Sequence, residues 1–200
     1  MGDDASRVAA LRAQMEQRLG PGRFRHSVAV AEEAVTMADL FGGDRTKVMI
    51  AGLIHDCAKD MAPADMLALA EKEGLLTDPA ERENPSLLHG PVGAWEAPRL
   101  WGVADPVILD AVRYHTFGAH NMSLEACIIF MADLIEEGRD YNGVHVLRQL
   151  CREDLQAAMI EAIEQTFVYL ERVRLPLHGG TLRCLDWLKK ERGISWKARI

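Results

Sequence analysis

Hydrophobic residues recur every three or four positions along most of the 200-residue chain, with polar residues between them. This spacing places hydrophobic side chains on one face of an α-helix. Glycine, proline and short polar runs separate the periodic segments, as is typical of helix ends. The pattern predicts helices over residues 4–19, 23–41, 45–58, 63–74, 87–100, 106–115, 124–135, 144–151 and 153–174, and a last helix that carries Trp187 and ends near residue 192. Residues 75–85 are polar and contain proline, so we predict a loop with at most a short turn, which could act as a mobile lid.

The segment 48–58 departs from this alternation because it is hydrophobic almost throughout, like a helix buried on all sides. It nevertheless contains His55 and Asp56 and is followed by Lys59. Ionised groups in such a helix are unfavourable unless they are paired or bind a metal. Neighbouring side chains point about 100° apart on a helix, so an imidazole and a carboxylate can reach one ion between them. The alternative is a core histidine bonded to the adjacent aspartate.

Composition and length favour an all-α protein with a single domain over residues 1–200. Hydrophobic residues make up 48% of the chain and aromatic residues only 6%, which favours helices over a β-sandwich or barrel. A length of 200 residues suffices for one sizeable core. The net charge of -7 argues against nucleic acid and anionic membranes as partners, so any anionic substrate must meet a local site.

The cysteines and the apolar runs predict a soluble cytoplasmic protein. The four cysteines are scattered without a Cys-x-x-Cys pattern, which indicates free thiols in a reducing compartment. No apolar run has the ~18 residues of a membrane span. The acidic start also lacks the charged and then apolar order of a signal peptide.

Four further titratable residues stand at unusual positions. His26 falls at the edge of the hydrophobic face of the helix 23–41, where it is either a core histidine or a ligand directed at His55. Asp133 is the lone carboxylate in the apolar run 126–135. His89 stands near the start of one predicted helix, and His115 at the end of another, facing a loop.

Histidine nitrogens and carboxylate oxygens together suit a first-row divalent metal, and the absence of cysteine argues against a structural zinc site. His26, His55, Asp56 and Asp133 would give four ligands from three helices and leave positions open for water and substrate. His89 and His115 would either complete a second metal position or contact phosphates and donate protons. Without the ion, these groups would share an apolar pocket uncompensated.

The order His, His-Asp, Asp resembles that of the HD-domain metal-dependent phosphohydrolases, an all-α superfamily. The His115-Thr116 and Arg139-Asp140-Tyr141 segments make the chain similar to the YqeK branch of that superfamily, which hydrolyses diadenosine tetraphosphate symmetrically to two ADP and binds iron. The similar segments are Arg25-His26-Ser27-Val28, Ala51 to Lys59, Leu88-His89-Gly90, His115-Thr116, Met131-Ala132-Asp133, Arg139-Asp140-Tyr141, Gly143-Val144 and Asp154-Leu155. The resemblance extends from Arg23 to Thr181 and implies a domain core at about 23–181.

Two positions depart from the family pattern. Phe117 stands where the family usually has a second threonine, and His178-Gly179-Gly180-Thr181 replaces a His-Pro-x-Thr segment. Both lie in loops expected to bind the nucleotide, so the resemblance defines the chemistry better than the base preference.

The resemblance implies metal binding by His26, His55, Asp56 and Asp133, and places His89, His115, Thr116 and Arg139 around the phosphates. His89 or His115 would stabilise phosphate oxygens or protonate the departing ADP. The guanidinium of Arg139 can bind two phosphate oxygens at once; otherwise it is a surface residue paired with Glu136 or Asp140.

The remaining candidates have weaker signals. Lys59 would stabilise the transferred charge, or simply lie at a helix C-terminus. Arg23 and His178 are further substrate-binding candidates, with a polar turn residue as the alternative for His178. Thr181 is either a substrate-binding residue or the N-cap of the last helix.

We therefore expect a metal-dependent hydrolase acting on a small-molecule nucleotide, with diadenosine tetraphosphate cleaved to two ADP. The alternatives are an HD hydrolase for another nucleotide, such as a nucleotidase or a guanosine polyphosphate hydrolase, and a non-catalytic regulatory domain that binds nucleotides. The resemblance implies iron as the cofactor, but histidine and carboxylate ligands also accept manganese, cobalt or nickel. A homodimer is an open alternative to the monomer.

Overall fold

The computed structural model describes residues 2–190, with side chains from Asp4 onward. Its elements are α1 (Gly2–Arg18), α2 (Pro21–Phe41), α3 (Arg45–Ile54), α4 (Pro63–Lys72), α5 (Ala80–Glu83), the 3₁₀ helix η1 (Pro85–Leu88), α6 (His89–Leu100), α7 (Pro106–Tyr114), α8 (Leu124–Ile135), α9 (Val144–Glu153), α10 (Leu155–Val173) and α11 (Gly179–Lys190). The described residues contain no strand, which confirms the all-α prediction. The predicted end of the last helix, near residue 192, lies outside the described residues.

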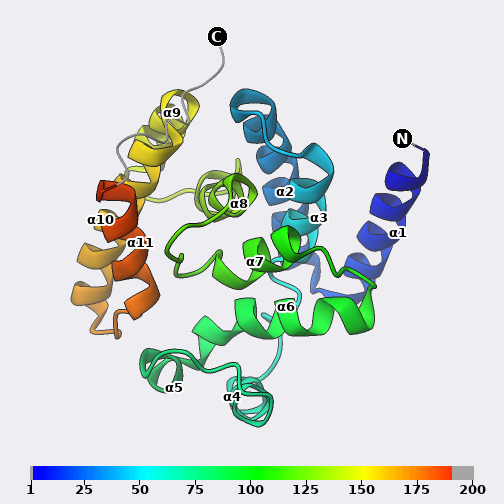
Figure 1. Ribbon diagram of the computed structural model, residues 1–200, viewed down its shortest axis with the longest axis horizontal. Coiled ribbons are helices and arrows are strands. Elements are labelled where there is room, and N and C mark those ends of the chain that lie inside the picture. Colours follow the sequence, from blue (N-terminus) through cyan, green and yellow to red (C-terminus); the bar gives the residue numbers. More distant parts are fainter. Residues whose placement is uncertain (1, 191–200) are drawn as a thin grey trace.

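The central helices surround α8, which Figure 1 shows end-on in the middle of the molecule. Helix α2 packs against both α3 and α8, and α7 packs against α3, α6 and α8. Helices α9, α10 and α11 lie on one side of α8 and α1 lies on the other, while α4 and α5 lie below α6 (Figure 1). Most of the buried hydrophobic side chains form one core, and a smaller cluster joins α4 to the start of α6.

The predicted helix 45–58 is wrong in its C-terminal part, because α3 ends at Ile54. Residues 55–60 instead form consecutive turns, in which the amide of Cys57 donates to Ile54 O at 3.0 Å and that of Lys59 to Asp56 O at 2.9 Å. The imidazole of His55 explains the change. Its Nδ1 lies 2.7 Å from Gly52 O, the carbonyl that the amide of residue 56 would bond in a continuing helix.

The predicted loop 75–85 is largely confirmed, since it contains only the single-turn α5 and the start of η1. The main chain of this loop is held by Glu81, which is fully buried. The carboxylate of Glu81 accepts hydrogen bonds from the amides of Thr77 and Asp78 at 2.6 and 2.9 Å. That the loop moves as a lid stays a prediction.

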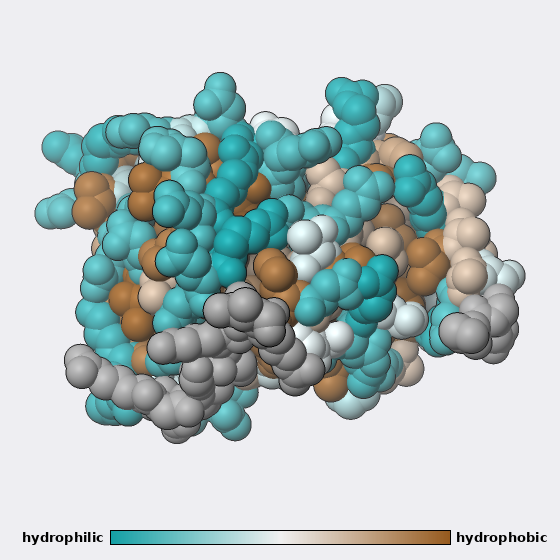
Figure 2. Space-filling view, turned by 90° about the horizontal axis from the view of Figure 1, so that it is seen from above, coloured by the Kyte–Doolittle hydropathy of each residue, from teal (hydrophilic) through white to brown (hydrophobic). Residues whose placement is uncertain are grey.

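Two surface features bear on the sequence predictions. Among the described residues, no helix is long and apolar enough to cross a membrane. On the face shown in Figure 2, hydrophobic residues stand singly or in small groups among hydrophilic ones.

All four cysteines are free and buried, as predicted for a protein without a disulfide framework.

Candidate metal centre

Most of the residues singled out in the sequence line one cavity of about 530 Å³. His55 is not among its lining residues, but its Nε2 lies within 4 Å of the lining carboxylates of Asp56 and Asp133. Helix α2 supplies His26, the turn after α3 supplies His55 and Asp56, and α8 supplies Asp133. His89 is the first residue of α6, and His115 directly follows α7. The cavity is lined by Gly22, Arg23, His26, Asp56, Lys59, His89, His115, Thr116, Phe130, Asp133, Leu134, Arg139 and Thr166.

Three histidines are held in the same way by the main chain. The Nδ1 atoms of His55, His89 and His115 lie 2.7, 2.5 and 2.7 Å from the carbonyl oxygens of Gly52, Ser86 and Val112. Each carbonyl belongs to the residue three positions earlier, so one local backbone geometry serves all three rings. A carbonyl can only accept, and Nδ1 therefore carries the proton in each pair. The Nε2 atoms are thus free of main-chain partners, and two of the three rings, His89 and His115, line the cavity.

The Nε2 atom of His55 has the least ordinary environment. It is buried and has no hydrogen-bond partner among residues 2–190, which the structure describes. Carboxylate oxygens lie nearby, with Asp133 Oδ1 at 3.8 Å and Asp56 Oδ2 at 3.9 Å. Burial is the main cause of a lowered pKa for His55, which keeps the ring neutral. A buried lone pair between two carboxylates is a donor prepared for a cation.

Both carboxylates are ionised and each has an arginine partner. Asp56 Oδ2 accepts from Arg23 Nη1 at 2.6 Å, and Asp133 Oδ1 accepts from Arg139 Nη2 at 2.5 Å. Burial by itself raises the pKa of Asp56, but the hydrogen bond to His89 opposes this effect, and the net pKa lies far below its usual range. Burial likewise raises the pKa of Asp133, but the hydrogen bond to His26 outweighs burial, and the net pKa lies far below its usual range.

His89 and His115 form a close pair on the other side of the cavity. Their Nε2 atoms lie 2.8 Å apart, and the hydroxyl of Thr116 lies 3.2 Å from each. At 2.8 Å, one of these nitrogens must carry a proton to avoid two opposed lone pairs. Burial, followed by the charge of His89, lowers the pKa of His115 to about 3, so His115 is the acceptor. Lys59 Nζ lies 3.1 Å from His89 Nδ1.

These donors fit a divalent metal. One ligand atom from each of His26, His55 and Asp56 lies within 4.8 Å of the others, and the same holds for the set His55, His115 and Asp133. The two sets share His55, whose Nε2 is the unpartnered buried atom. Neutral imidazoles with ionised carboxylates are the ligands of first-row divalent ions. The four predicted ligands are thus brought together.

The alternatives for Arg139 and Lys59 can be compared with the structure. Arg139 lines the cavity and bonds mainly to Asp133, with its Nε donating to the main-chain oxygen at 2.7 Å. Its Nε lies 3.8 Å from Glu136 Oε1, which makes that expected ion pair the weaker contact. Lys59 also lines the cavity and lies five residues beyond the end of α3, away from the last turn of a helix.

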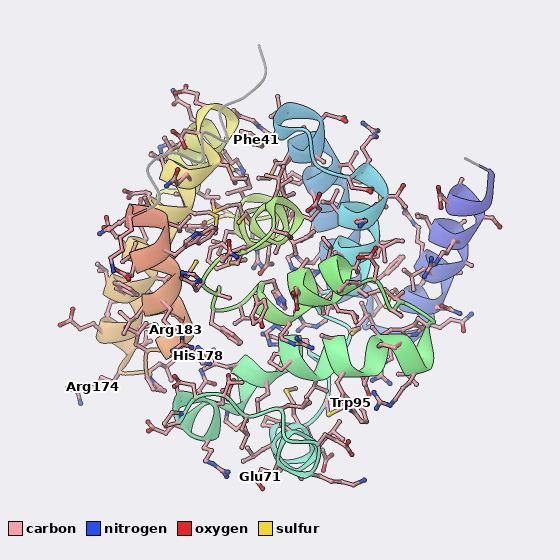
Figure 3. The ribbon with its side chains drawn as sticks, viewed as in Figure 1. Phe41, Glu71, Trp95, Arg174, His178 and Arg183 are labelled. Carbon is pink, nitrogen blue, oxygen red and sulfur yellow. The ribbon has the colours of Figure 1, made fainter. Side chains whose placement is uncertain are left out.

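His178 and Thr181 do not line this cavity among the described residues. His178 is buried at the lower end of α11, above α5 (Figure 3). Its ring stacks on Phe117 with centroids 3.9 Å apart, and its Nε2 lies 3.2 Å from Glu81 Oε1. The N-cap interpretation of Thr181 is wrong, because α11 begins at Gly179 and the Thr181 amide donates to His178 O inside the first turn.

One buried residue of the site was missed from the sequence. Glu136 is 4% exposed, and its Oε1 lies 3.1 Å from His26 Nδ1, while His26 Nε2 lies 2.9 Å from Asp133 Oδ1. Glu136 therefore orients the imidazole from behind. A signal was present, because Glu136 follows Asp133 by three positions and so lies near it on α8 and its end.

Comparisons with known proteins agree with this arrangement. Residues 23–138 match the HD domain family. A protein of Bacillus subtilis named bis(5'-nucleosyl)-tetraphosphatase, symmetrical, is 38% identical over 88% of this chain and 94% of its own length. A protein of the same name from Halalkalibacterium halodurans is 35% identical over 84% of this chain and 90% of its own length.

A solved structure is also similar. The crystal structure of a Clostridium acetobutylicum protein, described as a predicted HD superfamily hydrolase involved in NAD metabolism, aligns with a TM-score of 0.88 at 33% identity. The alignment covers 92% of this chain and 97% of that chain. The similarity therefore extends through the helices that surround the cavity and beyond them.

Proposed function

Because this chain belongs to the HD-domain family, we propose that it is a divalent-metal-dependent hydrolase that cleaves diadenosine tetraphosphate symmetrically into two ADP. The observation that carries the proposal is the set of three histidines whose Nδ1 atoms are tied to the main chain while Nε2 faces two ionised carboxylates. The names of the similar proteins from Bacillus and Halalkalibacterium support the choice of substrate.

In this proposal His26, His55, Asp56 and Asp133 hold the metal, with iron preferred and manganese, cobalt or nickel as alternatives. A divalent ion at this place supplies an activated water at neutral pH and polarises the phosphoryl oxygen that is attacked. The carboxylates keep their charge at neutral pH because histidines and arginines surround them. His55 stays neutral and keeps its lone pair because it is buried.

The other side chains of the cavity act on the phosphates. Arg23, Lys59 and Arg139 bring cationic groups to the cavity, where they bind phosphate oxygens and stabilise charge that develops during cleavage. The Thr116 hydroxyl bonds the His89 and His115 pair and lies beside the same phosphates. The proton held between the two Nε2 atoms is placed to reach the departing ADP, with His89 as its donor.

His178 and Thr181 take a supporting part in this proposal. His178 stacks on Phe117, the neighbour of Thr116, and its bond to Glu81 ties the loop before η1 to the start of α11. We assign to His178 the positioning of the segment 115–117, and we place Thr181 in the turn that holds His178. A cytoplasmic location is in keeping with the four free, buried thiols.

Product analysis tests the proposal against its alternatives. Metal-loaded protein is incubated with diadenosine tetraphosphate, guanosine polyphosphates, nucleoside monophosphates and NAD, and the products are separated by ion-exchange chromatography. We expect two ADP and no free phosphate from diadenosine tetraphosphate, and loss of this activity in Asp56→Ala. Formation of ATP with AMP, or faster turnover of another nucleotide, would contradict the substrate. Binding without any turnover would favour a regulatory domain.

A further inference from the structure

A second cavity of about 650 Å³ adjoins the metal cavity. The two share Leu134 and Thr166 as lining residues, so they meet along one edge. The second cavity is formed by the C-terminal half of α10 and the turn before α9; Arg174, at the end of α10, is labelled in Figure 3. Its lining is Leu134, Tyr141, Asn142, Gly143, Leu147, Ala162, Gln165, Thr166, Val168, Tyr169 and Arg172.

The lining of the second cavity differs in kind from that of the metal cavity. Among the described residues that line the second cavity, Arg172 is the only ionisable side chain apart from the two tyrosines. Three histidines, two aspartates, two arginines and a lysine line the metal cavity. Tyr141, Val168 and Tyr169 expose 38%, 69% and 50% of their surface, an unusual share for large apolar side chains on adjacent elements. A cavity of this kind suits a flat, largely uncharged group.

The two tyrosine rings of this cavity can stack on a flat ligand group. The Tyr141 hydroxyl donates to Leu134 O at 3.0 Å, which fixes this ring at the boundary between the two cavities. Arg172 also lines the cavity, with its guanidinium carbon 5.7 Å from the centroid of the Tyr169 ring. Aromatic rings and guanidinium planes are the groups on which nucleobases stack.

Amide groups supply the polar edge that a base also requires. Asn142, exposed in the turn before α9, and Gln165 of α10 both line the cavity. The Gln165 Nε2 atom donates to Glu161 Oε1 at 2.9 Å, which leaves its carbonyl oxygen as an acceptor. Gly143 has a φ of 95°, and a Cβ there would lie 3.6 Å from Gln165 Oε1, so the turn approaches this amide closely.

We propose that the second cavity binds the nucleoside of a nucleotide whose phosphates lie in the metal cavity. The shared edge at Leu134 and Thr166 lets one ligand pass from the charged cavity into the aromatic one. In a dinucleoside polyphosphate this group is one of the two nucleosides, so the inference rests on the proposed function for the phosphates. It adds the residues that recognise the base, headed by Tyr169, Tyr141 and Gln165.

The test compares two ligands that differ only in having a nucleoside. Dissociation constants of ADP and of inorganic pyrophosphate are measured by calorimetry on metal-loaded wild type and Tyr169→Ala. Stacking of a base on an aromatic ring contributes enough that its loss weakens binding roughly tenfold. We therefore expect ADP binding to weaken about tenfold in Tyr169→Ala, with pyrophosphate binding unchanged and Tyr169→Phe close to wild type.

Leu182→Ala is the matched control, because Leu182 is 49% exposed on α11 and lines neither cavity. Unchanged ADP binding in Tyr169→Ala, equal weakening of both ligands, or failure of wild type to bind ADP more tightly than pyrophosphate would each overturn the inference. So would sedimentation showing that Tyr169→Ala only dissociates a dimer. If diadenosine tetraphosphate is not cleaved while the ADP difference persists, the proposed substrate fails and the nucleoside site stands.

Discussion

Glu136 Oε1 lies 3.1 Å from His26 Nδ1, on the opposite side of the imidazole from Asp133. The carboxylate of Glu136 is buried, and its other oxygen accepts from the Gly138 amide at 2.5 Å. The ring of His26 is therefore clamped in one orientation, with Nε2 directed at the cavity. Such a partner behind a metal-binding histidine sets the tautomer and raises the basicity of the ligand atom.

Glu136→Gln should weaken metal binding by about tenfold, because the neutral amide is a poorer acceptor for the Nδ1 proton. Metal affinity is measured by competition with a chelator of known affinity. The control is Glu137→Gln, which changes the charge of an exposed neighbour outside the cavity. Equal affinities of the Glu136 and Glu137 variants would mean that Glu136 has no part in holding the ligand.

Metal binding should release a proton near neutral pH. Burial lowers the pKa of His26, but its bonds to Asp133 and Glu136 outweigh burial, so the net pKa is raised. The metal needs the neutral ring, and it must displace a proton that the raised pKa retains. Affinity should therefore fall as the pH drops through the raised pKa of His26, which lies above its ordinary value.

Calorimetry of metal binding at pH 7 in buffers of different ionisation enthalpy measures this proton. The heat should differ between buffers for wild type and for His120→Gln, which alters an exposed histidine outside the cavity. It should differ less for His26→Gln. A heat independent of buffer in the wild type would show that His26 is already neutral before the metal binds.

The periodic pattern predicted most helices to within a few residues, because each buries its own hydrophobic stripe. It failed at the end of α3, where the chain is apolar throughout and only the bond from His55 to Gly52 O marks the break. The six titratable residues at the centre were found because a charge in an apolar run is locally visible. The ion pair between Arg23 and Asp56 was not predicted. These residues lie 33 positions apart, and contacts over such a separation leave no local pattern in the sequence.

The packing of α2 on α3 was equally invisible in the sequence. Gly52 faces α2, and a Cβ at this position would lie 2.6 Å from the Cα of Ala31. The Cα of Ala31 belongs to the main chain of α2 and the new Cβ would be fixed to the main chain of α3, so neither atom can rotate away. Gly52→Ala should lower the free energy of unfolding by about 1–3 kcal/mol through this overpacking.

Urea denaturation measures the effect, with Gly22→Ala as the matched control. A Cβ at Gly22 meets nothing closer than 3.9 Å, and alanine in a helix is favoured over glycine. The control should therefore be neutral or slightly stabilised. Equal stability of the two variants would show that α2 and α3 can move apart without loss.

Arg139→Lys should remain folded but lose about 1.5–3 kcal/mol of transition-state stabilisation in kcat/KM. Arg139 uses Nε for Asp133 O and Nη2 for Asp133 Oδ1, so its planar fork is held at the cavity by two bonds. Lysine keeps the charge and loses the fork. Arg25→Lys, an exposed change on α2 outside the cavity, serves as the control. A wild-type kcat/KM for Arg139→Lys would remove this residue from phosphate binding.

A substitution at Asp133 distinguishes a metal site from an ordinary buried ion pair. If Asp133 is a metal ligand, Asp133→Asn should weaken metal binding by about tenfold or more and remove most of the activity. The sequence alone suggests that the metal-free pocket is uncompensated, so that this change would leave the stability of the apo protein unchanged or raise it by about 1 kcal/mol. The structure corrects that expectation, because Arg139 Nη2 and His26 Nε2 lie 2.5 and 2.9 Å from Asp133 Oδ1.

The apo protein should therefore also be destabilised by Asp133→Asn, by about 1–3 kcal/mol at pH 7. The pKa of Asp133 is depressed in the folded state, so its contribution is present above the unfolded pKa and is lost as pH falls below about 4. Melting temperatures of wild type and variant, with and without chelator, measure both the loss of stability in the apo protein and the stabilisation by metal. A ligand role requires that added metal raise the wild-type melting temperature more than that of Asp133→Asn. Equal increases would leave Asp133 as the partner of Arg139 and His26 alone.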